Sequence, residues 1–222
     1  MLGSITTGLT LLALAGATPV PQAASSSQLS RSKGYDLRIQ LLDPAKDLDP
    51  PVDGQYLSTY HVGAGLNVAV AGAPRDPSYS FPPYYSNGTA EQGWVSVLND
   101  LGTSFPWGVS AQNATSFDVT YPGEHDVDIN VGGGSNGIHV AKTGDSVALA
   151  GLAPGNFAVC NRFIGYARSN LTVVKYVYEG ETLPEDCVGV QFTAYCSELE
   201  DLPEGSEWTH DFVQEVDCVV PA

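Results

Sequence analysis

Apolar residues recur at every second position in several short segments of the chain. In one of them, Arg38 and Gln40 separate Leu37, Ile39 and Leu41. Because successive side chains of a β-strand point to opposite faces, this spacing gives a strand one apolar and one polar face. Turn-forming Gly, Pro and Asn lie between the segments. The pattern predicts an all-β fold, an antiparallel two-sheet β-sandwich in a single domain. The other sets are Leu66, Val68 and Val70; Val127, Ile129 and Val131; Phe157, Val159 and Phe163; and Val188, Val190 and Phe192.

The first residues are similar to a secretory signal peptide. An apolar run from Leu9 to Ala15 leads into Gly16 and Ala17, and small residues at this place suit signal peptidase. The run is much shorter than the roughly 20 apolar residues that cross a bilayer. We therefore expect residues 1–17 to be a signal peptide and the mature protein to be secreted.

Residues 18–33 are small and polar and contain Pro. Such a segment cannot bury enough apolar surface to order itself, so we expect a disordered tail or pro-segment there. The β-sandwich domain is then expected in residues 34–222, a length that all-β domains commonly reach.

The four cysteines form an even set, which in an oxidising compartment predicts two disulfides with three alternative connectivities. Cys187 and Cys196 stand at the two ends of an expected strand, about 30 Å apart, whereas a disulfide needs Cα atoms within about 7 Å. Of the two remaining connectivities we favour Cys160 with Cys187 and Cys196 with Cys218, since neighbouring segments tend to be adjacent in space.

N-glycosylation sequons begin at Asn87, Asn113 and Asn170. Together with the leader they predict a secreted glycoprotein that displays these residues at its surface.

The formal net charge is −16, and no Lys or Arg follows Lys175, while twelve Asp or Glu do. Binding to phosphate depends on Lys and Arg, so the charge argues against nucleic acid and against a membrane as partners. No calcium-binding loop with regularly spaced acids is present. We expect a monomer without a cofactor.

The segment from Tyr35 to Gly72 carries three recognisable elements. They are an amphipathic strand Y-D-L-R-I-Q-L-L, an acidic loop D-L-D-P-P-V-D-G, and the run Y-L-S-T-Y-H-V-G-A-G-L that closes on Asn67. The segment resembles the opening of an uncharacterised family of fungal small secreted β proteins with an H-V-G-A-G-L-N signature. The resemblance implies no known reaction.

Residues Gly133 to Gly137 satisfy the pattern G-x-S-x-G, which in hydrolases exposes a nucleophile, here Ser135. Strand-like segments flank the motif on both sides, so we expect a hairpin loop rather than a strand-to-helix turn. A serine hydrolase stays an alternative, with His210 and either Asp201 or Asp186 as partners.

Glu124, His125 and Asp126 could serve general acid and base chemistry, which gives a second form of the hydrolase alternative. A solvated strand face shared by Asp126, Asp128 and Asn130 explains the acids more simply. We expect no strongly coupled pair and no convergence of polar residues.

The four histidines show no metal-binding spacing, so we expect no metal site. His61 precedes Gly63-Ala64-Gly65, where we expect a tight bend. We expect His61 to fix this corner with a hydrogen bond and Asn67 to share that role. Ligand binding by both residues is the alternative.

The stretch from Ala73 to Gln92 reads as a long loop rich in aromatic residues. Its rings, with Trp94 and Trp107 near in sequence, could stack on sugars or a partner protein, or could pack the loop onto the sandwich. The function we expect is non-enzymatic binding of a carbohydrate or an extracellular protein. The candidate ligand-binding rings are those of Tyr79, Phe81, Tyr84 and Tyr85.

Overall fold

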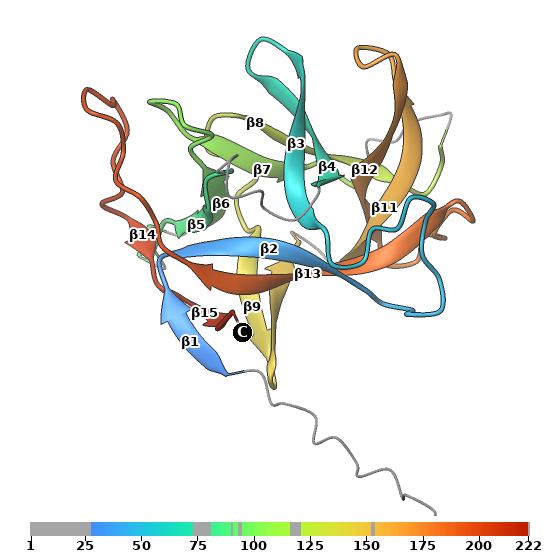
Figure 1. Ribbon diagram of the computed structural model, residues 1–222, viewed down its shortest axis with the longest axis horizontal. Helices are drawn as coiled ribbons and strands as arrows, with labels where there is room; N and C mark the ends of the chain where they lie inside the picture. The colour runs from blue at the N-terminus through green and yellow to red at the C-terminus, as the bar shows by residue number, and fades with distance from the viewer. Residues whose placement is uncertain are drawn as a thin grey trace, which may run out of the picture.

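The computed structural model describes residues 28–72, 81–89, 91–92, 95–115, 121–151 and 154–221. These residues form strands and loops and contain no helix, as the alternating pattern predicted (Figure 1). Accordingly, none of the described segments is a helix that could cross a membrane. The strands are β1 (Leu29–Ser32), β2 (Gly34–Leu41), β3 (Tyr56–Gly63), β4 (Leu66–Gly72), β5 (Tyr84–Asn87), β6 (Ser96–Asn99), β7 (Trp107–Ala111), β8 (His125–Val131), β9 (His139–Thr143), β10 (Ser146–Ala150), β11 (Gly155–Ile164), β12 (Ser169–Tyr178), β13 (Cys187–Ser197), β14 (Val213–Gln214) and β15 (Val216–Val219).

The described strands form one continuous mixed sheet rather than the two separate sheets that we expected. Its main path runs β1-β15-β13-β11-β12-β4-β3-β2-β5-β6-β7-β8, and β13–β2, β12–β8 and β4–β8 pair in addition. Long strands change partner along their length, and these changes connect all described strands into one sheet. β12 pairs with β11 throughout and with β8 near its end, where Lys175 lies opposite Asp126. The pairing of β13 with β15 is parallel.

The core lies inside this curved sheet. Leu37 and Ile39 of β2 are buried and meet Phe192 of β13 in the same cluster. These two strands are paired antiparallel over eight residues, so their predicted apolar faces coincide.

The predicted inward face is wrong on β4. Asn67 and Ala69 are buried there, whereas Leu66 is half exposed. Two polar groups of the buried Asn67 have partners: its backbone N–H donates to Asn130 Oδ1, and its side-chain oxygen accepts from His61 Nδ1. Phe163 on β11 is also exposed, because β11 extends beyond the core toward the hairpin turn.

Both favoured disulfides are present. Cys160 and Cys187 are directly opposite each other on β11 and β13, and their Cα atoms are 4.3 Å apart. Cys196, at the other end of β13, is bonded to Cys218 of β15 with a Cα separation of 5.1 Å. The two bridges therefore tie both ends of β13 to its neighbours.

The ordered fold begins before the expected boundary at residue 34. β1 is paired antiparallel with β15, and Leu29 lies opposite Val219. Backbone pairing orders this part of the expected tail although its sequence is polar. Residues 1–27, which include the expected signal peptide, lie outside the described residues.

Candidate functional site

A cleft of about 420 Å³ opens between the β3–β4 hairpin and the loop from β6 to β7. β3 supplies Ser58, Thr59 and His61, while β4 supplies Asn67. Phe81 and Pro82 precede β5 on one side of the cleft. The loop between β6 and β7 completes the lining with Leu101, Gly102 and Thr103, followed by Trp107 at the start of β7.

The polar side of the cleft is built on one cross-strand pair. His61 and Asn67 lie opposite each other, and His61 Nδ1 is 3.2 Å from Asn67 Oδ1. Since the amide oxygen can only accept, Nδ1 carries the hydrogen, and in the neutral ring Nε2 is then an acceptor. The expected corner is present, with a bulge after His61 and Gly65 at φ +71°.

Aromatic rings form the apolar side of the cleft. Trp107 is largely buried, and its Nε1 donates to Thr103 Oγ1 at 3.0 Å, which fixes the indole against the loop. The ring of Phe105, exposed to 44%, lies 6.3 Å from that of Trp107. Phe81, whose ring is 5.8 Å from that of Tyr84, lines the other side.

The lining is also uncharged, apart from the titratable ring of His61. Among the described residues that border the cleft there is no Asp, Glu, Lys or Arg, although the chain carries a net charge of −16. A pair of carboxylates, which most glycoside hydrolases require, is therefore missing from the described lining. The cleft offers stacking surfaces and hydrogen bonds to a neutral ligand.

The structure separates the candidate ligand-binding residues. His61, Asn67 and Phe81 meet in the cleft. Tyr84 and Tyr85, in contrast, are buried in β5, so the expected long loop contains a strand and these two rings belong to the interior. Tyr79 and Trp94 lie outside the described residues.

Tyr85 belongs to a polar cluster that the sequence did not reveal. Its hydroxyl donates to Asp100 Oδ1 at 2.7 Å, and His210 Nε2 lies 3.0 Å from Asp100 Oδ2. The ring of His210 also contacts that of Tyr85, with 4.8 Å between the centroids. His210 is thus paired with Asp100, and not with Asp201 or Asp186 as the hydrolase alternative required.

The G-x-S-x-G segment is not a hairpin loop, because β8 and β9 on either side of it do not pair with each other. The segment instead crosses β7, where the Ser135 amide donates to Val109 O and Ser135 Oγ accepts from the Ala111 amide. A Cβ on Gly134, whose φ is +68°, would collide with β7. The glycines therefore allow close backbone packing, and Ser135 is engaged by the main chain.

Glu124 is the centre of a buried ion network, which corrects our expectation of dispersed polar groups. Arg162 donates to both Glu124 oxygens at 3.0 Å, and also to both oxygens of Asp186 and to Asn161 O. All five guanidinium N–H groups are thereby used. Although burial acts in the opposite direction, the hydrogen bonds to Asp186 and Glu124 raise the pKa of Arg162 above its usual value.

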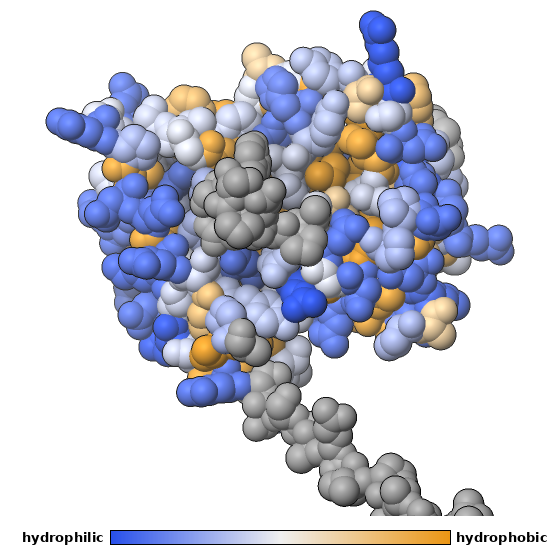
Figure 2. All heavy atoms as spheres, viewed as in Figure 1, coloured by the Kyte–Doolittle hydropathy of each residue, from blue (hydrophilic) through white to orange (hydrophobic). Residues whose placement is uncertain are grey.

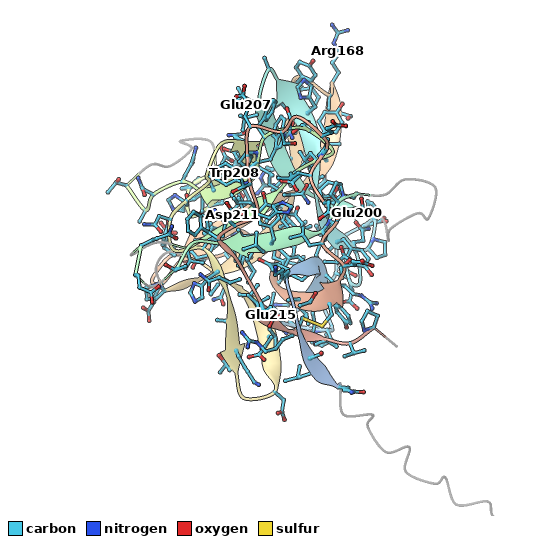
Figure 3. The ribbon with its side chains drawn as sticks, turned by 90° about the vertical axis from the view of Figure 1, so that its left-hand side faces the viewer. Arg168, Glu200, Glu207, Trp208, Asp211 and Glu215 are labelled. Atoms are coloured by element: carbon cyan, nitrogen blue, oxygen red, sulfur yellow. A yellow bond between two sulfur atoms is a disulfide. The ribbon has the colours of Figure 1, made fainter. Side chains whose placement is uncertain are left out.

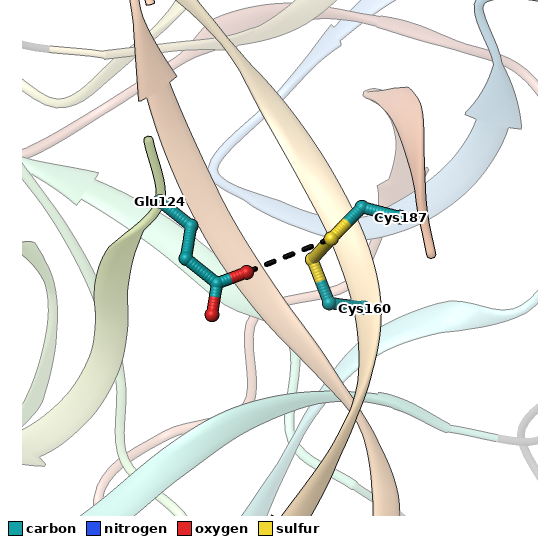
Figure 4. A group of neighbouring side chains, drawn as sticks. All are labelled: Glu124, Cys160 and Cys187. Atoms are coloured by element: carbon teal, nitrogen blue, oxygen red, sulfur yellow. Dashed lines mark hydrogen bonds between the residues drawn. A yellow bond between two sulfur atoms is a disulfide. The ribbon is translucent and has the colours of Figure 1, made fainter. Parts of the chain in front are cut away.

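Glu124 also faces the disulfide between Cys160 and Cys187 (Figure 4). One carboxylate oxygen lies 3.5 Å from Cys187 Sγ, and Arg162 Nη2 lies 3.2 Å from the same sulfur. Because both sulfurs are in the disulfide, they are not thiolate ligands, and this group has the character of a packed structural centre.

Lys175 extends the network to the acids of β8. Its Nζ lies 3.4 Å from Glu124 Oε1 and binds Asp126 Oδ1. Burial, together with the neighbouring charge of Asp126, raises the pKa of Asp128 to about 6, against the lowering effect of Lys175. The polar face of β8 is thus only partly solvated: Asp126, Asp128 and Asn130 are half-buried, and Asp126 is paired with Lys175.

His125 is fully enclosed and points to Glu181. Its Nε2 lies 3.0 and 3.1 Å from the two carboxylate oxygens, and the Tyr178 amide donates to one of them at 2.8 Å. Although partial burial acts in the opposite direction, the His125 and Tyr178 hydrogen bonds lower the pKa of Glu181. His125 thus pairs with Glu181, whereas Glu124 and Asp126 share Lys175, so the triplet does not form an acid and base pair of its own.

The sequons differ in accessibility. Asn87 is buried in β5, so its amide has no room for a glycan in the folded protein, contrary to expectation. Asn113 and Asn170 are exposed, and Asn170 lies on β12.

Comparison with known proteins places the chain beside a family model and a fungal relative. A family described as "Domain of unknown function (DUF7907)" matches residues 32–196. The chain is also 30% identical over 202 residues to "Antigenic protein SchS34" of Stachybotrys chartarum, an alignment that covers 85% of this chain and 86% of the relative. No solved structure matches.

Proposed function

Since the chain belongs to the family of the domain of unknown function DUF7907, we propose a function from its own cleft: it is a secreted, non-enzymatic protein that binds a neutral saccharide. Two disulfides support an extracellular location. The description of its fungal relative as an antigenic protein is consistent with that location.

The observation that carries the proposal is the His61–Asn67 pair beside the aromatic wall of the cleft, which Phe81 and Trp107 form. Among the described residues, no hydrogen bond uses His61 Nε2 or Asn67 Nδ2. Neutral Nε2 accepts and the amide nitrogen donates, so the pair presents one acceptor and one donor. Adjacent sugar hydroxyls can each donate and accept and therefore match such a pair.

The aromatic wall supplies the second part of saccharide recognition. Trp107 and Phe81 line the cleft, and the ring of Phe105 lies next to that of Trp107 outside the lining. The C–H faces of sugar rings are apolar and pack on aromatic faces, while the polar edges remain available for hydrogen bonds. The uncharged lining favours a neutral sugar over a uronic acid or a phosphorylated ligand.

Glycan arrays carrying neutral and charged saccharides, followed by calorimetric titration with the strongest binder, test the proposal. We expect His61→Ala and Phe81→Ala, which both remove side chains of the cleft lining, each to raise Kd about tenfold, which corresponds to about 1.4 kcal/mol. His139→Ala and Phe212→Ala are matched controls, because both residues are exposed and neither lines the cleft. Binding to an extracellular protein in place of any saccharide, or equal saccharide binding by all variants, would overturn the proposal.

A further inference from the structure

Phe163 is the most exposed of the large apolar side chains that the structure describes, with 63% of its surface accessible. It lies near the end of β11, in the β11–β12 hairpin that projects from the same side of the molecule as the β3–β4 hairpin (Figure 1). Arg168 marks the tip of this hairpin (Figure 3). Hydrophobic residues gather in the upper right of Figure 2, over the region of β4, β11 and β12.

The register of the hairpin places Phe163 directly opposite Asn170. Residues that are directly opposite in an antiparallel pair point to the same face, with Cβ atoms about 5 Å apart. Asn170 is exposed and begins the sequon Asn-Leu-Thr. The most exposed aromatic ring of the described residues and a glycosylation acceptor are therefore side-by-side neighbours on a regular strand pair.

We propose that the N-linked glycan on Asn170 packs its first N-acetylglucosamine onto the ring of Phe163. The sugar leaves the Asn170 amide in the direction in which Phe163 extends, so its apolar C–H face can cover the ring. Contact with an aromatic face removes apolar surface of both partners from water. The glycan then acts as a fixed part of the hairpin surface and covers a hydrophobic side chain that would otherwise face solvent.

The other two sequons lack this arrangement among the described residues. Asn87 is buried. Asn113 lies in the loop that follows β7, where it has no cross-strand partner among the described residues. The inference rests on the secretion part of the proposed function and is independent of saccharide binding in the cleft.

The test is a double-mutant cycle on protein secreted from a eukaryotic host. The four proteins are the wild type, Asn170→Gln, Phe163→Ala and the double variant, with site occupancy measured by peptide mass spectrometry. Asn170→Gln is used because the Thr172 hydroxyl contacts Ala71 O, so a change at Thr172 would also disturb packing. We expect Asn170 to be occupied, and Asn170→Gln to lower Tm by about 2–4 °C with Phe163 present. In the Phe163→Ala background the same change should have little effect.

Two further measurements separate this packing from a general effect of glycans. Trimming the glycan to its first sugar with an endoglycosidase should retain the stabilisation, since only that sugar contacts Phe163. Phe105→Ala, which removes an exposed ring elsewhere, should leave the effect of Asn170→Gln unchanged. Secretion of protein with an empty Asn170 site, or equal effects of Asn170→Gln with and without Phe163, would overturn the inference. Failure of secretion would overturn the proposed location as well.

Discussion

Arg162 and Glu124 form a bidentate ion pair inside the protein, with both N···O distances 3.0 Å and both side chains almost completely buried. Arg162 comes from β11, whereas Glu124 immediately precedes β8, so the pair joins segments that are distant in sequence. The ring of Tyr121 lies over the guanidinium at 4.2 Å. This centre explains how a strongly acidic chain places a carboxylate in its interior.

Glu124→Gln should destabilise the protein by about 3–5 kcal/mol, because it leaves the buried charge of Arg162 with a weaker partner. Urea unfolding monitored by tryptophan fluorescence measures this change. Asp43→Asn is the matched control, since Asp43 pairs with Lys46 at the surface and should change stability by less than about 1 kcal/mol. Equal effects of the two substitutions would show that the buried pair is not an important stabilising contact.

Stability should depend on pH with a maximum near pH 4 to 5. The folded protein holds the pKa of Asp128 at about 6, above its usual 3.8, so this group's contribution is complete below pH 3.8 and is lost as the pH rises through 6. Hydrogen bonds to Arg162 lower the pKa of Asp186. Although partial burial acts in the opposite direction, the hydrogen bond to His125 lowers the pKa of Glu181. The stability that the charged carboxylates of Asp186 and Glu181 contribute is lost as the pH falls below about 4.

Asp128→Asn should therefore flatten the decrease in Tm between pH 4 and pH 7 and raise stability at neutral pH. Thermal melts of the wild type and the variant across this range measure the effect. Asp145→Asn, a change at an exposed acid, should leave the slope unchanged. A wild-type Tm that rises steadily from pH 4 to pH 7 would contradict the assignment.

Tyr85→Phe should destabilise the protein by about 1–3 kcal/mol without changing saccharide binding. The substitution leaves Asp100 Oδ1 without its hydrogen bond from the buried hydroxyl. Chemical denaturation together with calorimetric titration measures both quantities. Weaker saccharide binding by a folded Tyr85→Phe protein would contradict this and show that Tyr85 takes part in ligand binding.

The wild-type protein should not react with a fluorophosphonate probe. Ser135 Oγ accepts a backbone hydrogen bond, and none of the described histidines is its hydrogen-bond partner. Gel detection of labelled protein, with Ser135→Ala as the blank, measures this. Labelling of the wild type that disappears in Ser135→Ala would revive the hydrolase alternative.

The sequence predicted those parts of the fold that depend on local pattern. The alternation in β2 and β13 identified core strands, and strand geometry excluded a bond between Cys187 and Cys196. β5 was missed because all four of its residues are buried, so no alternation distinguishes it from a loop. The sandwich prediction also could not show that β12 changes partner along its length.

The sequence predicted only part of the candidate site, because some of its contacts are local and others depend on long-range strand pairing. His61 and Asn67 are joined by a short hairpin, and their contact follows from local spacing. The contribution of Thr103 and Trp107 depends on where the β6–β7 loop meets that hairpin, and long-range pairing decides this. The ion network around Glu124 likewise requires β8, β11 and β12 to come together, and their separation in sequence conceals it.

Chemical-shift mapping with the saccharide selected on the array tests the central claim most directly. We predict that addition of the sugar shifts the amide resonances of His61, Asn67 and Thr103 and the indole resonance of Trp107, while those of β9 and β10 remain in place. Saturable shifts confined to any other surface, with the cleft resonances unchanged, would contradict the account.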